Sequence, residues 1–312
     1  EHGDAAEAIG FFRKMEKEKR MAPDKVTYLS LLKACARLHY LAMGESVYSR
    51  ITQCGMGAWP FVGSAIVDMY AKCGVLEDAR HVFDYMTEQD LVSWNAIIAA
   101  YSVHESPIEA LVLFQKMVKM DVKPDKVTFL TILKACANLG AFEHGRCIHA
   151  CIYDNGFDSD VFVGSTLIDM YGKCGMPHHA REVFETMSTR DEVSWSAMIA
   201  GYGQLGMADK AVEVFLEMER ECVRIDDITF VGILSACTHS GLVKEGCAYF
   251  DMMKKRHGIM PTSEVCACMV DLLGRAGQIM EALAFIKVVE VEPTASVWMA
   301  LLNACKLSGD IN

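Results

Sequence analysis

The chain of 312 residues is 52% hydrophobic and contains only seven prolines. This composition excludes a disordered chain, and its richness in Ala, Leu, Met and Glu favours helices over strands. The net charge of −11 is the opposite of the basic signature of a protein that coats phosphate backbones non-specifically. It bears less on the reading of individual bases, for which local side chains matter more than total charge.

No stretch approaches the roughly 18 to 20 uninterrupted apolar residues that cross a bilayer, so no membrane partner is expected. The chain begins at Glu1, inside a helical pattern and without an Arg-rich leader, so we expect that a targeting segment is not present in it. Thirteen cysteines, an odd number with no C-x-x-C pair, predict reduced intracellular thiols. Cys35 in LLKACARL and Cys136 in ILKACANL fit helical apolar patterns as small core residues.

From Lys25 onward the chain repeats itself at an offset of 101 residues, after a truncated leading unit at 1–24. KVTYLSLLKACARL at Lys25 returns as KVTFLTILKACANL at Lys126 and as DITFVGILSACTHS at Asp227. Each of the first two periods divides, at the residue before a new helix, into units of 35, 31 and 35 residues. The predicted units are 25–59, 60–90, 91–125, 126–160, 161–191, 192–226, 227–262 and 263–294.

Each unit contains two amphipathic stretches separated by a short break that contains glycine, as at Lys72-Cys73-Gly74 and Lys173-Cys174-Gly175. In the second stretch of the unit 60–90, Ala79, Val82, Phe83 and Met86 follow the spacing of one buried helical face. The pattern predicts an all-α chain of helix-turn-helix repeats. Stacking the hairpins buries a continuous core, so the sequence predicts one solenoid over residues 1–294.

The strings VSWNAIIAAY, FVGSAIVDMYAKCGVLEDARHVFDYM and TFLTILKACANLGAFEHGRCIHA resemble pentatricopeptide repeats. The order and lengths of the units resemble the PLS subclass, which alternates standard, long and short repeats. The resemblance implies a right-handed superhelical solenoid that binds single-stranded RNA in a plant mitochondrion or chloroplast. It also implies the target-recognition module of an organellar C-to-U RNA editing factor.

In that family one repeat reads one base, mainly through the fifth and last residues of each unit. A short hydroxyl leaves room for a purine, a longer amide reaches a pyrimidine, and a terminal Asp favours G or U, which present a keto oxygen and a ring N–H. The implied reading pairs are Ser64 with Asp90 for G, Asn95 with Asp125 for U, Ser165 with Asp191 for G, and Ser196 with Asp226 for G. Asp24 of the leading unit implies G or U.

The three long units, whose fifth residues have no hydrogen-bonding side chain, are expected to space or pack, and the last short unit is assigned no base. Their fifth and last residues are Leu29 with Trp59, Leu130 with Asp160, Val231 with Thr262, and Ala267 with Thr294. The implied RNA site, from 5′ to 3′, is therefore (G/U)-n-G-U-n-G-G-n-n.

The resemblance also implies that the second residue of a unit sandwiches bases, which any base tolerates because each has a π-face. These residues are Phe61, Val92, Phe162 and Val193. It further implies that Lys72, Lys173 and Arg275 approach phosphates.

Some of the aspartates and tryptophans in these units also have a purely structural explanation. An Asp before a helix is also an N-cap, so Asp90, Asp125, Asp191 and Asp226 can serve both roles. Trp94, Trp195 and Trp298 each lie beside an apolar helical run, and we predict burial between hairpins for all three rather than RNA stacking.

No cofactor or metal is expected, because Cys266 and Cys268 lack the spacing of a zinc site and His149, His178 and His179 lack a ligand set. Nothing resembles the H-x-E and P-C-x-x-C motifs of a zinc deaminase, so the chain is not expected to be an enzyme. Residues 295–312 resemble the start of a truncated C-terminal extension motif. A cytidine deaminase-type protein is then expected in trans or on a missing C-terminus. The alternatives are a factor that protects or matures RNA by occupying it, a protein-binding helical scaffold and, more remotely, a ribonuclease.

Overall fold

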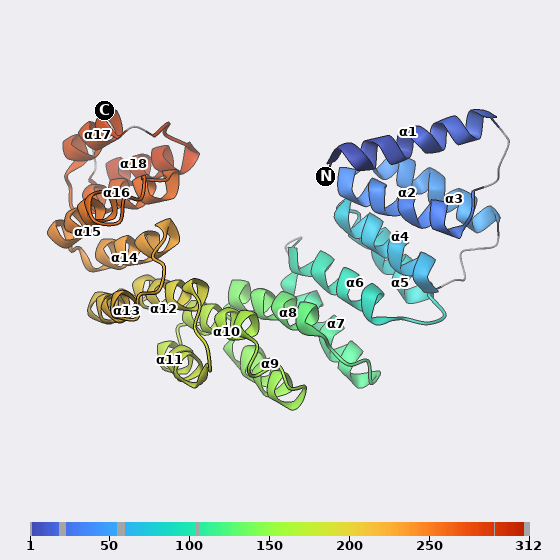
Figure 1. Ribbon diagram of the computed structural model, residues 1–312, viewed down its shortest axis with the longest axis horizontal. Coiled ribbons are helices and arrows are strands. Elements are labelled where there is room, and N and C mark those ends of the chain that lie inside the picture. The colour runs from blue at the N-terminus through green and yellow to red at the C-terminus, as the bar shows by residue number, and fades with distance from the viewer. Residues whose placement is uncertain (1, 19–22, 55–59, 104–105, 290, 309–312) are drawn as a thin grey trace. The chain divides into compact units, whose positions relative to one another are not determined.

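The computed structural model describes residues 2–18, 23–54, 60–103, 106–289 and 291–308 (Figure 1). Within these ranges the chain forms eighteen α-helices and no β-strand. The expected all-α fold is confirmed. None of the described helices is long and apolar enough to cross a bilayer.

The chain divides into two compact units, Glu1–Ala135 and Cys136–Asn312, here called the N-terminal and C-terminal units. The N-terminal unit contains α1 (His2–Glu18), α2 (Lys25–Leu38), α3 (Leu41–Gln53), α4 (Pro60–Lys72), α5 (Leu76–Tyr85), α6 (Leu91–Val103) and α7 (Pro107–Lys119). Helix α8 (Lys126–Leu139) spans the boundary. The C-terminal unit contains α9 (Phe142–Asp154), α10 (Val161–Lys173), α11 (Pro177–Thr186), α12 (Glu192–Gln204), α13 (Ala208–Arg220), α14 (Asp227–Ser240), α15 (Val243–Lys255), α16 (Ser263–Arg275), α17 (Ile279–Val288) and α18 (Ala295–Ser308).

Each predicted repeat start from Lys25 onward is the first residue of an α-helix, and the even-numbered helices are the first helices of their hairpins. The turns inside the hairpins explain the glycine breaks. Gly74 and Gly175 have φ values of 79° and 74°, which is the left-handed region that glycine enters without a steric penalty. The division into a repeat array and a C-terminal extension at residue 295 stays a prediction.

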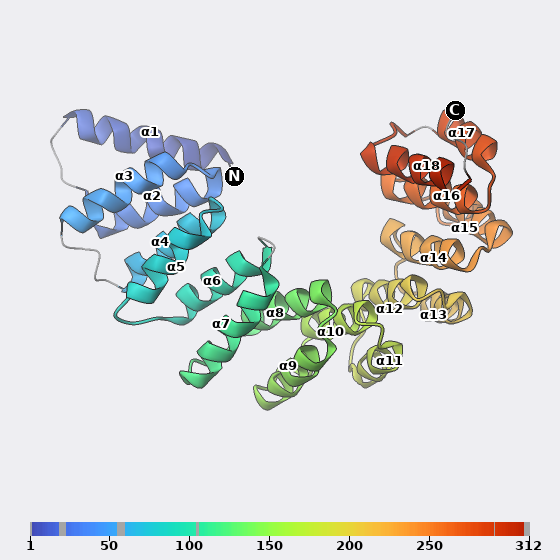
Figure 2. The ribbon, with the colours of Figure 1, turned by 180° about the vertical axis from the view of Figure 1, so that it is seen from behind.

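Within each of the two compact units, the first helices of successive hairpins pack side by side. Helix α4 contacts α2 and α6 in the N-terminal unit, while α12 contacts α10 and α14 in the C-terminal unit (Figure 2). A Cβ atom on Gly172 in α10 would lie 3.0 Å from the Cα of Gly201 in α12. The backbones of α10 and α12 therefore approach each other more closely than a side chain at this place would allow.

The buried side chains agree with most of the sequence interpretation. Trp94 and Trp195 are fully buried, and each packs edge-on against a phenylalanine of the preceding helix with ring centroids 4.7 Å apart. All thirteen cysteines are free thiols, and Cys35 and Cys136 are buried.

The predicted burial of Trp298 is wrong, because its side chain is 47% exposed. Helix α18 buries Val297, Leu301 and Ala304 instead, which form one face at spacings of four and three residues. Trp298 is one residue, or about 100°, further round the helix than Val297 and so lies off that face.

Candidate functional site

In the N-terminal unit the predicted reading residues meet in hydrogen-bonded pairs. Ser64 Oγ, in the second turn of α4, donates to Asp90 Oδ1 at 2.8 Å. Asn95 Nδ2, at the same place in α6, donates to Asp125 Oδ1 at 3.0 Å. The stacking of first helices thus brings together side chains that are 26 and 30 residues apart in sequence.

In the C-terminal unit the pairs are looser or indirect. Ser165 Oγ donates to the Val161 carbonyl at 2.8 Å and lies 3.5 Å from Asp191 Oδ1. Ser196 Oγ lies 2.9 Å from Thr229 Oγ1, which in turn donates to Asp226 Oδ1 at 2.8 Å. A third residue therefore links this pair.

The last residue of each reading unit is also an N-cap. Asp90, Asp125, Asp191 and Asp226 each accept, through Oδ1, the backbone N–H of the residue three positions later, at 2.8 to 2.9 Å. The capping role expected from the sequence is confirmed. It does not exclude contact with a base, because a carboxylate has two oxygens and about four acceptor sites.

The carboxyl group of Asp125 is held in its ionised form. Burial works to raise its pKa, but hydrogen bonds from the backbone and side chain of Thr128 and from Asn95 together lower the pKa below its ordinary value. The group is therefore an acceptor at neutral pH. A hydrogen-bond donor can therefore approach this carboxylate, whereas a lone pair is repelled by it.

Asp24 occupies the last position of the leading unit and caps α2. Thr27 donates to its Oδ1 through the backbone N–H at 2.8 Å and through the side-chain hydroxyl at 2.6 Å. The side-chain hydrogen bond is the largest of the effects that lower the pKa of Asp24. Trp59, the last residue of the next unit, lies outside the described residues.

The second residues of the units are exposed apolar side chains. Phe61, Val92, Phe162 and Val193 are between 55% and 65% exposed. Lys25 Nζ lies over the Phe61 ring, 5.0 Å from its centroid. Large apolar side chains that are exposed at the same place in successive repeats mark a surface that can contact a ligand.

Three further exposed second residues were not predicted from the sequence. Val26, Val127 and Ile228, the second residues of the units that were expected to act as spacers, are equally exposed. The 101-residue offset relates all three and could have identified them. The unit that begins at Ser263 departs from the pattern, because it carries the exposed Glu264 at this place.

The three cations that the resemblance implies for phosphate contact all have an acidic partner on the same helix, four residues earlier. Lys72 pairs with Asp68 at 2.8 Å, Lys173 with Asp169 at 2.8 Å, and Arg275 with Asp271 at 2.9 Å. The cationic side chains are between 39% and 51% exposed. An exposed pair of this kind contributes about 1 kcal/mol or less, so a phosphate can displace the carboxylate.

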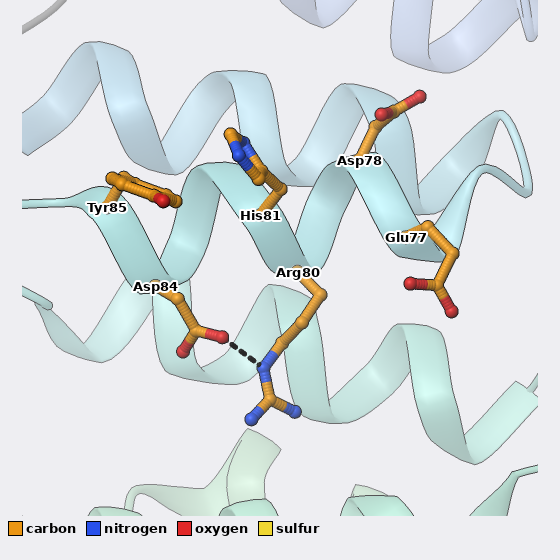
Figure 3. A pocket seen from close by; sticks show the side chains of 6 residues that line it. All are labelled: Glu77, Asp78, Arg80, His81, Asp84 and Tyr85. Atoms are coloured by element: carbon orange, nitrogen blue, oxygen red, sulfur yellow. Dashed lines mark hydrogen bonds and ion pairs between the residues drawn. The ribbon is translucent and has the colours of Figure 1, made fainter.

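Two hollows are lined by residues other than the paired side chains. The side chains around the first all come from α5, where Arg80 Nε pairs with Asp84 at 2.7 Å (Figure 3). A hollow on a single helix of mixed charge does not enclose a ligand. The second lies among α9, α10 and α11, where His149 Nδ1 is 2.9 Å from the Tyr171 hydroxyl and burial lowers the pKa of His149.

The histidines named in the sequence analysis differ in their surroundings. His149 is half-buried against Tyr171, and the ring of His179 stacks on the same tyrosine with centroids 5.3 Å apart. His178 is exposed. Among the residues that the structure describes, no group of three or more His, Cys, Asp or Glu side chains could hold a metal ion.

Profiles of known protein families match most of the repeats. A profile described as the PPR repeat family matches residues 89–138. A profile described as the PPR repeat matches residues 26–56, 64–91, 165–191, 193–223 and 228–257. Together these matches cover more than half of the chain. The chain belongs to the pentatricopeptide repeat family.

Curated pentatricopeptide repeat proteins of Arabidopsis thaliana align along nearly the whole chain. The chloroplastic protein CRR2 is 38% identical over 99% of this chain and 48% of its own length. The mitochondrial protein At1g06140 is 37% identical over 94% of this chain and 52% of its own length. The chain spans between 35% and 52% of the length of such relatives.

A solved pentatricopeptide repeat structure has the same fold. The crystal structure of PPR10 in complex with an 18-nucleotide psaJ RNA element superposes with a TM-score of 0.79 at 22% identity, over 96% of this chain and 44% of that one. This likeness confirms the fold of stacked helical hairpins, and the reading pairs described above lie at the repeat junctions of that fold.

Proposed function

We propose that this chain binds single-stranded RNA in a sequence-specific manner, with each complete reading pair selecting one base. The observation that carries the proposal is a direct hydrogen bond between the fifth and the last residue of the same repeat. It occurs in two successive repeats, at 2.8 Å and 3.0 Å. Each pair lies close in sequence to an exposed apolar second residue on the same first helix. The RNA held by PPR10, a protein of the same fold, supports the proposal.

The pairs distinguish bases by hydrogen-bond polarity. Guanine presents N1–H and uracil presents N3–H, whereas adenine and cytosine present a lone pair at the corresponding ring nitrogen. The ionised Asp125 accepts a ring N–H and repels a ring lone pair, so its repeat selects against cytosine. In combination with Asn95, which reaches further than serine, the proposed base is U, and the Ser–Asp pairs take G.

Stacking and phosphate contact supply affinity without selecting a base. We propose that the exposed row of Val26, Phe61, Val92 and Val127 holds bases in the N-terminal unit. Phe162, Val193 and Ile228 do the same in the C-terminal unit. If Lys72, Lys173 and Arg275 alone neutralise phosphates, the logarithm of the binding constant falls with the logarithm of salt at a slope of roughly −2, from about −0.7 per contact.

The wider role that we propose is the recognition module of an organellar C-to-U RNA editing factor of the PLS subclass. The alternation of 35-, 31- and 35-residue units supports the subclass. The chloroplastic and mitochondrial names of its relatives support an organellar location. In this role the chain binds and does not catalyse, and a cytidine deaminase-type protein acts in trans or on a further segment of the same protein. Protection of a transcript by site occupancy is the alternative that uses the same interface.

The test is a fluorescence-anisotropy titration of the RNA G-n-G-U-n-G-G-n-n at fixed moderate salt, beside copies with U changed to C and each specified G changed to A. We expect the matched RNA to bind at least tenfold more tightly than a single mismatch, because a mismatch leaves a buried polar group unpaired. Equal binding of all copies would reject base reading. It would favour a protein-binding scaffold, which the net charge of −11 also permits.

Removing the acidic partners of the phosphate-contacting lysines is expected to strengthen RNA binding. In the variant Asp68→Asn with Asp169→Asn, Lys72 and Lys173 no longer have to leave a carboxylate to reach a phosphate. Each exposed pair contributes about 0.2 to 1 kcal/mol, so the affinity for the matched RNA should rise about threefold. The dissociation constant at moderate salt measures the change.

The matched control is Asp251→Asn. Asp251 pairs with Lys255 at the same spacing, but on α15, the second helix of its hairpin. We expect no change in affinity for this control. A similar gain in the control would attribute the effect to total charge and would contradict phosphate contact by Lys72 and Lys173.

A further inference from the structure

The third residue of the repeat that follows each reading pair carries a hydroxyl group, and this hydroxyl takes two different positions. Ser93 and Ser194 donate to the backbone carbonyl of the preceding Asp, both at 2.8 Å. Thr128 Oγ1 instead lies 2.6 Å from Asn95 Oδ1 and 2.9 Å from Asp125 Oδ1. Thr229 Oγ1 likewise contacts both Ser196 and Asp226. The threonines therefore touch both members of a reading pair, and the serines hold only the backbone.

Asp125 and Thr128 together fix which way the Asn95 amide faces. The ionised Asp125 only accepts hydrogen bonds, so the amide must turn its Nδ2 group toward that carboxylate, at 3.0 Å. Oδ1 then faces Thr128, whose one hydroxyl proton lies between Asn95 Oδ1 at 2.6 Å and Asp125 Oδ1 at 2.9 Å. The flipped amide would place Oδ1 against the carboxylate and lose the hydrogen bond that Nδ2 donates to it. The second hydrogen of Nδ2 is left to donate to a carbonyl oxygen of a base.

Thr229 orients the Ser196 hydroxyl in a comparable way. Asp226 Oδ1 accepts the Thr229 proton at 2.8 Å, so Thr229 Oγ1 has only lone pairs to offer Ser196. Ser196 must then donate its own single proton to Thr229. Its oxygen is left with lone pairs, which accept an N–H from a base. A hydroxyl that could otherwise donate or accept is thereby made an acceptor.

We infer that Thr128 and Thr229 are positioning residues that set the hydrogen-bond polarity of Asn95 and Ser196, and through it the base selected at these two repeats. The inference rests on the proposed RNA-binding function. At these two reading sites, the fifth and last residues are joined by a threonine from the following repeat, which helps to select the base. The Ser64 and Ser165 sites, which are followed by serine, lack this control.

The test compares Thr128→Val, Thr128→Ser and Ser93→Ala with the unchanged chain. The readout is the ratio of dissociation constants for RNAs that carry C or U at the base opposite Asn95. This ratio does not depend on the fraction of protein that is folded, so a loss of helix capping does not change it. We expect Thr128→Val to reduce the preference for U about tenfold, and Thr128→Ser to reduce it as well, because a serine hydroxyl at this place bonds to the backbone carbonyl. Ser93→Ala should stay within about twofold of the unchanged chain.

A second variant, Thr229→Val, tests the same inference at an independent site, through the ratio for A and G opposite Ser196. An unchanged chain that prefers U and G, with both valine variants keeping those preferences within twofold, would overturn the inference and leave the proposed function standing. An unchanged chain with no base preference would overturn the proposed function and the inference with it.

Discussion

Replacing Asn95 by serine is expected to change the base preferred by its repeat from U to G. The variant would have the same reading set as the repeat 101 residues later, namely a serine at the fifth position, a terminal Asp and a bridging threonine. The surrounding strings, VSWNAIIAAY and VSWSAMIAGY, are nearly identical. The shorter side chain makes room for a purine, while Asp125 still requires a ring N–H, so guanine is accepted and adenine is not.

The size of this switch follows from one gained and one lost hydrogen bond near a charged group. At about 1.5 to 3 kcal/mol each, the ratio of affinities for G and U should change by a factor of roughly 100 or more. Anisotropy titrations with RNAs that differ only at this base measure it. The reciprocal control, Ser196→Asn, should move its own repeat from G toward U. A uniform loss of affinity for both RNAs would show that Asn95 supports the fold and does not read the base.

Replacing Trp195 by alanine is expected to lower the free energy of unfolding by about 3 to 5 kcal/mol. Trp195 is only 1% exposed and packs on Phe184 in the preceding helix, while α12 packs against both α10 and α14. The cavity therefore weakens adjacent repeats together, since each repeat of a stacked array is stabilised by its neighbours. Urea denaturation followed by circular dichroism measures the loss.

Two variants separate packing from other causes. Trp298→Ala removes the same side chain from a site that is 47% exposed, and we expect a loss of about 1 kcal/mol or less. Trp195→Phe keeps most of the ring, and the buried indole N–H has no hydrogen-bond partner among the described residues, so a loss of about 1 kcal/mol is expected. Similar losses for Trp195→Ala and Trp298→Ala would contradict the assignment of Trp195 to the core.

The fold could be predicted from the sequence because one period organises the chain. A repeated register places a capping Asp before a first helix, so the unit starts deduced at Leu91 and Glu192 are also the first residues of α6 and α12. The same register predicts which residues occupy equivalent places. It could also have indicated the Asp68–Lys72 pair, because residues four apart on a helix are neighbours.

Side-chain direction is what the register does not determine. Ser93 and Thr128 occupy the same place in successive repeats, yet one hydroxyl turns to the backbone and the other to the reading pair. At the four equivalent places both serines take the first arrangement and both threonines take the second, so residue type and not register separates them. Trp195 follows Val193 by two residues, whereas Trp298 follows Val297 directly. In α18 the valine lies on the buried face, so Trp298 is exposed.

The central claim is that the side chains of the reading pairs determine which RNA is bound. The most direct test is selection of RNA by the unchanged chain from a pool of random sequence, followed by sequencing of the bound fraction. We expect enrichment of G-U followed, after one unspecified base, by G-G, in that order from 5′ to 3′. A bound fraction with no enriched motif, or with a motif that does not change in the Asn95→Ser variant, would contradict it.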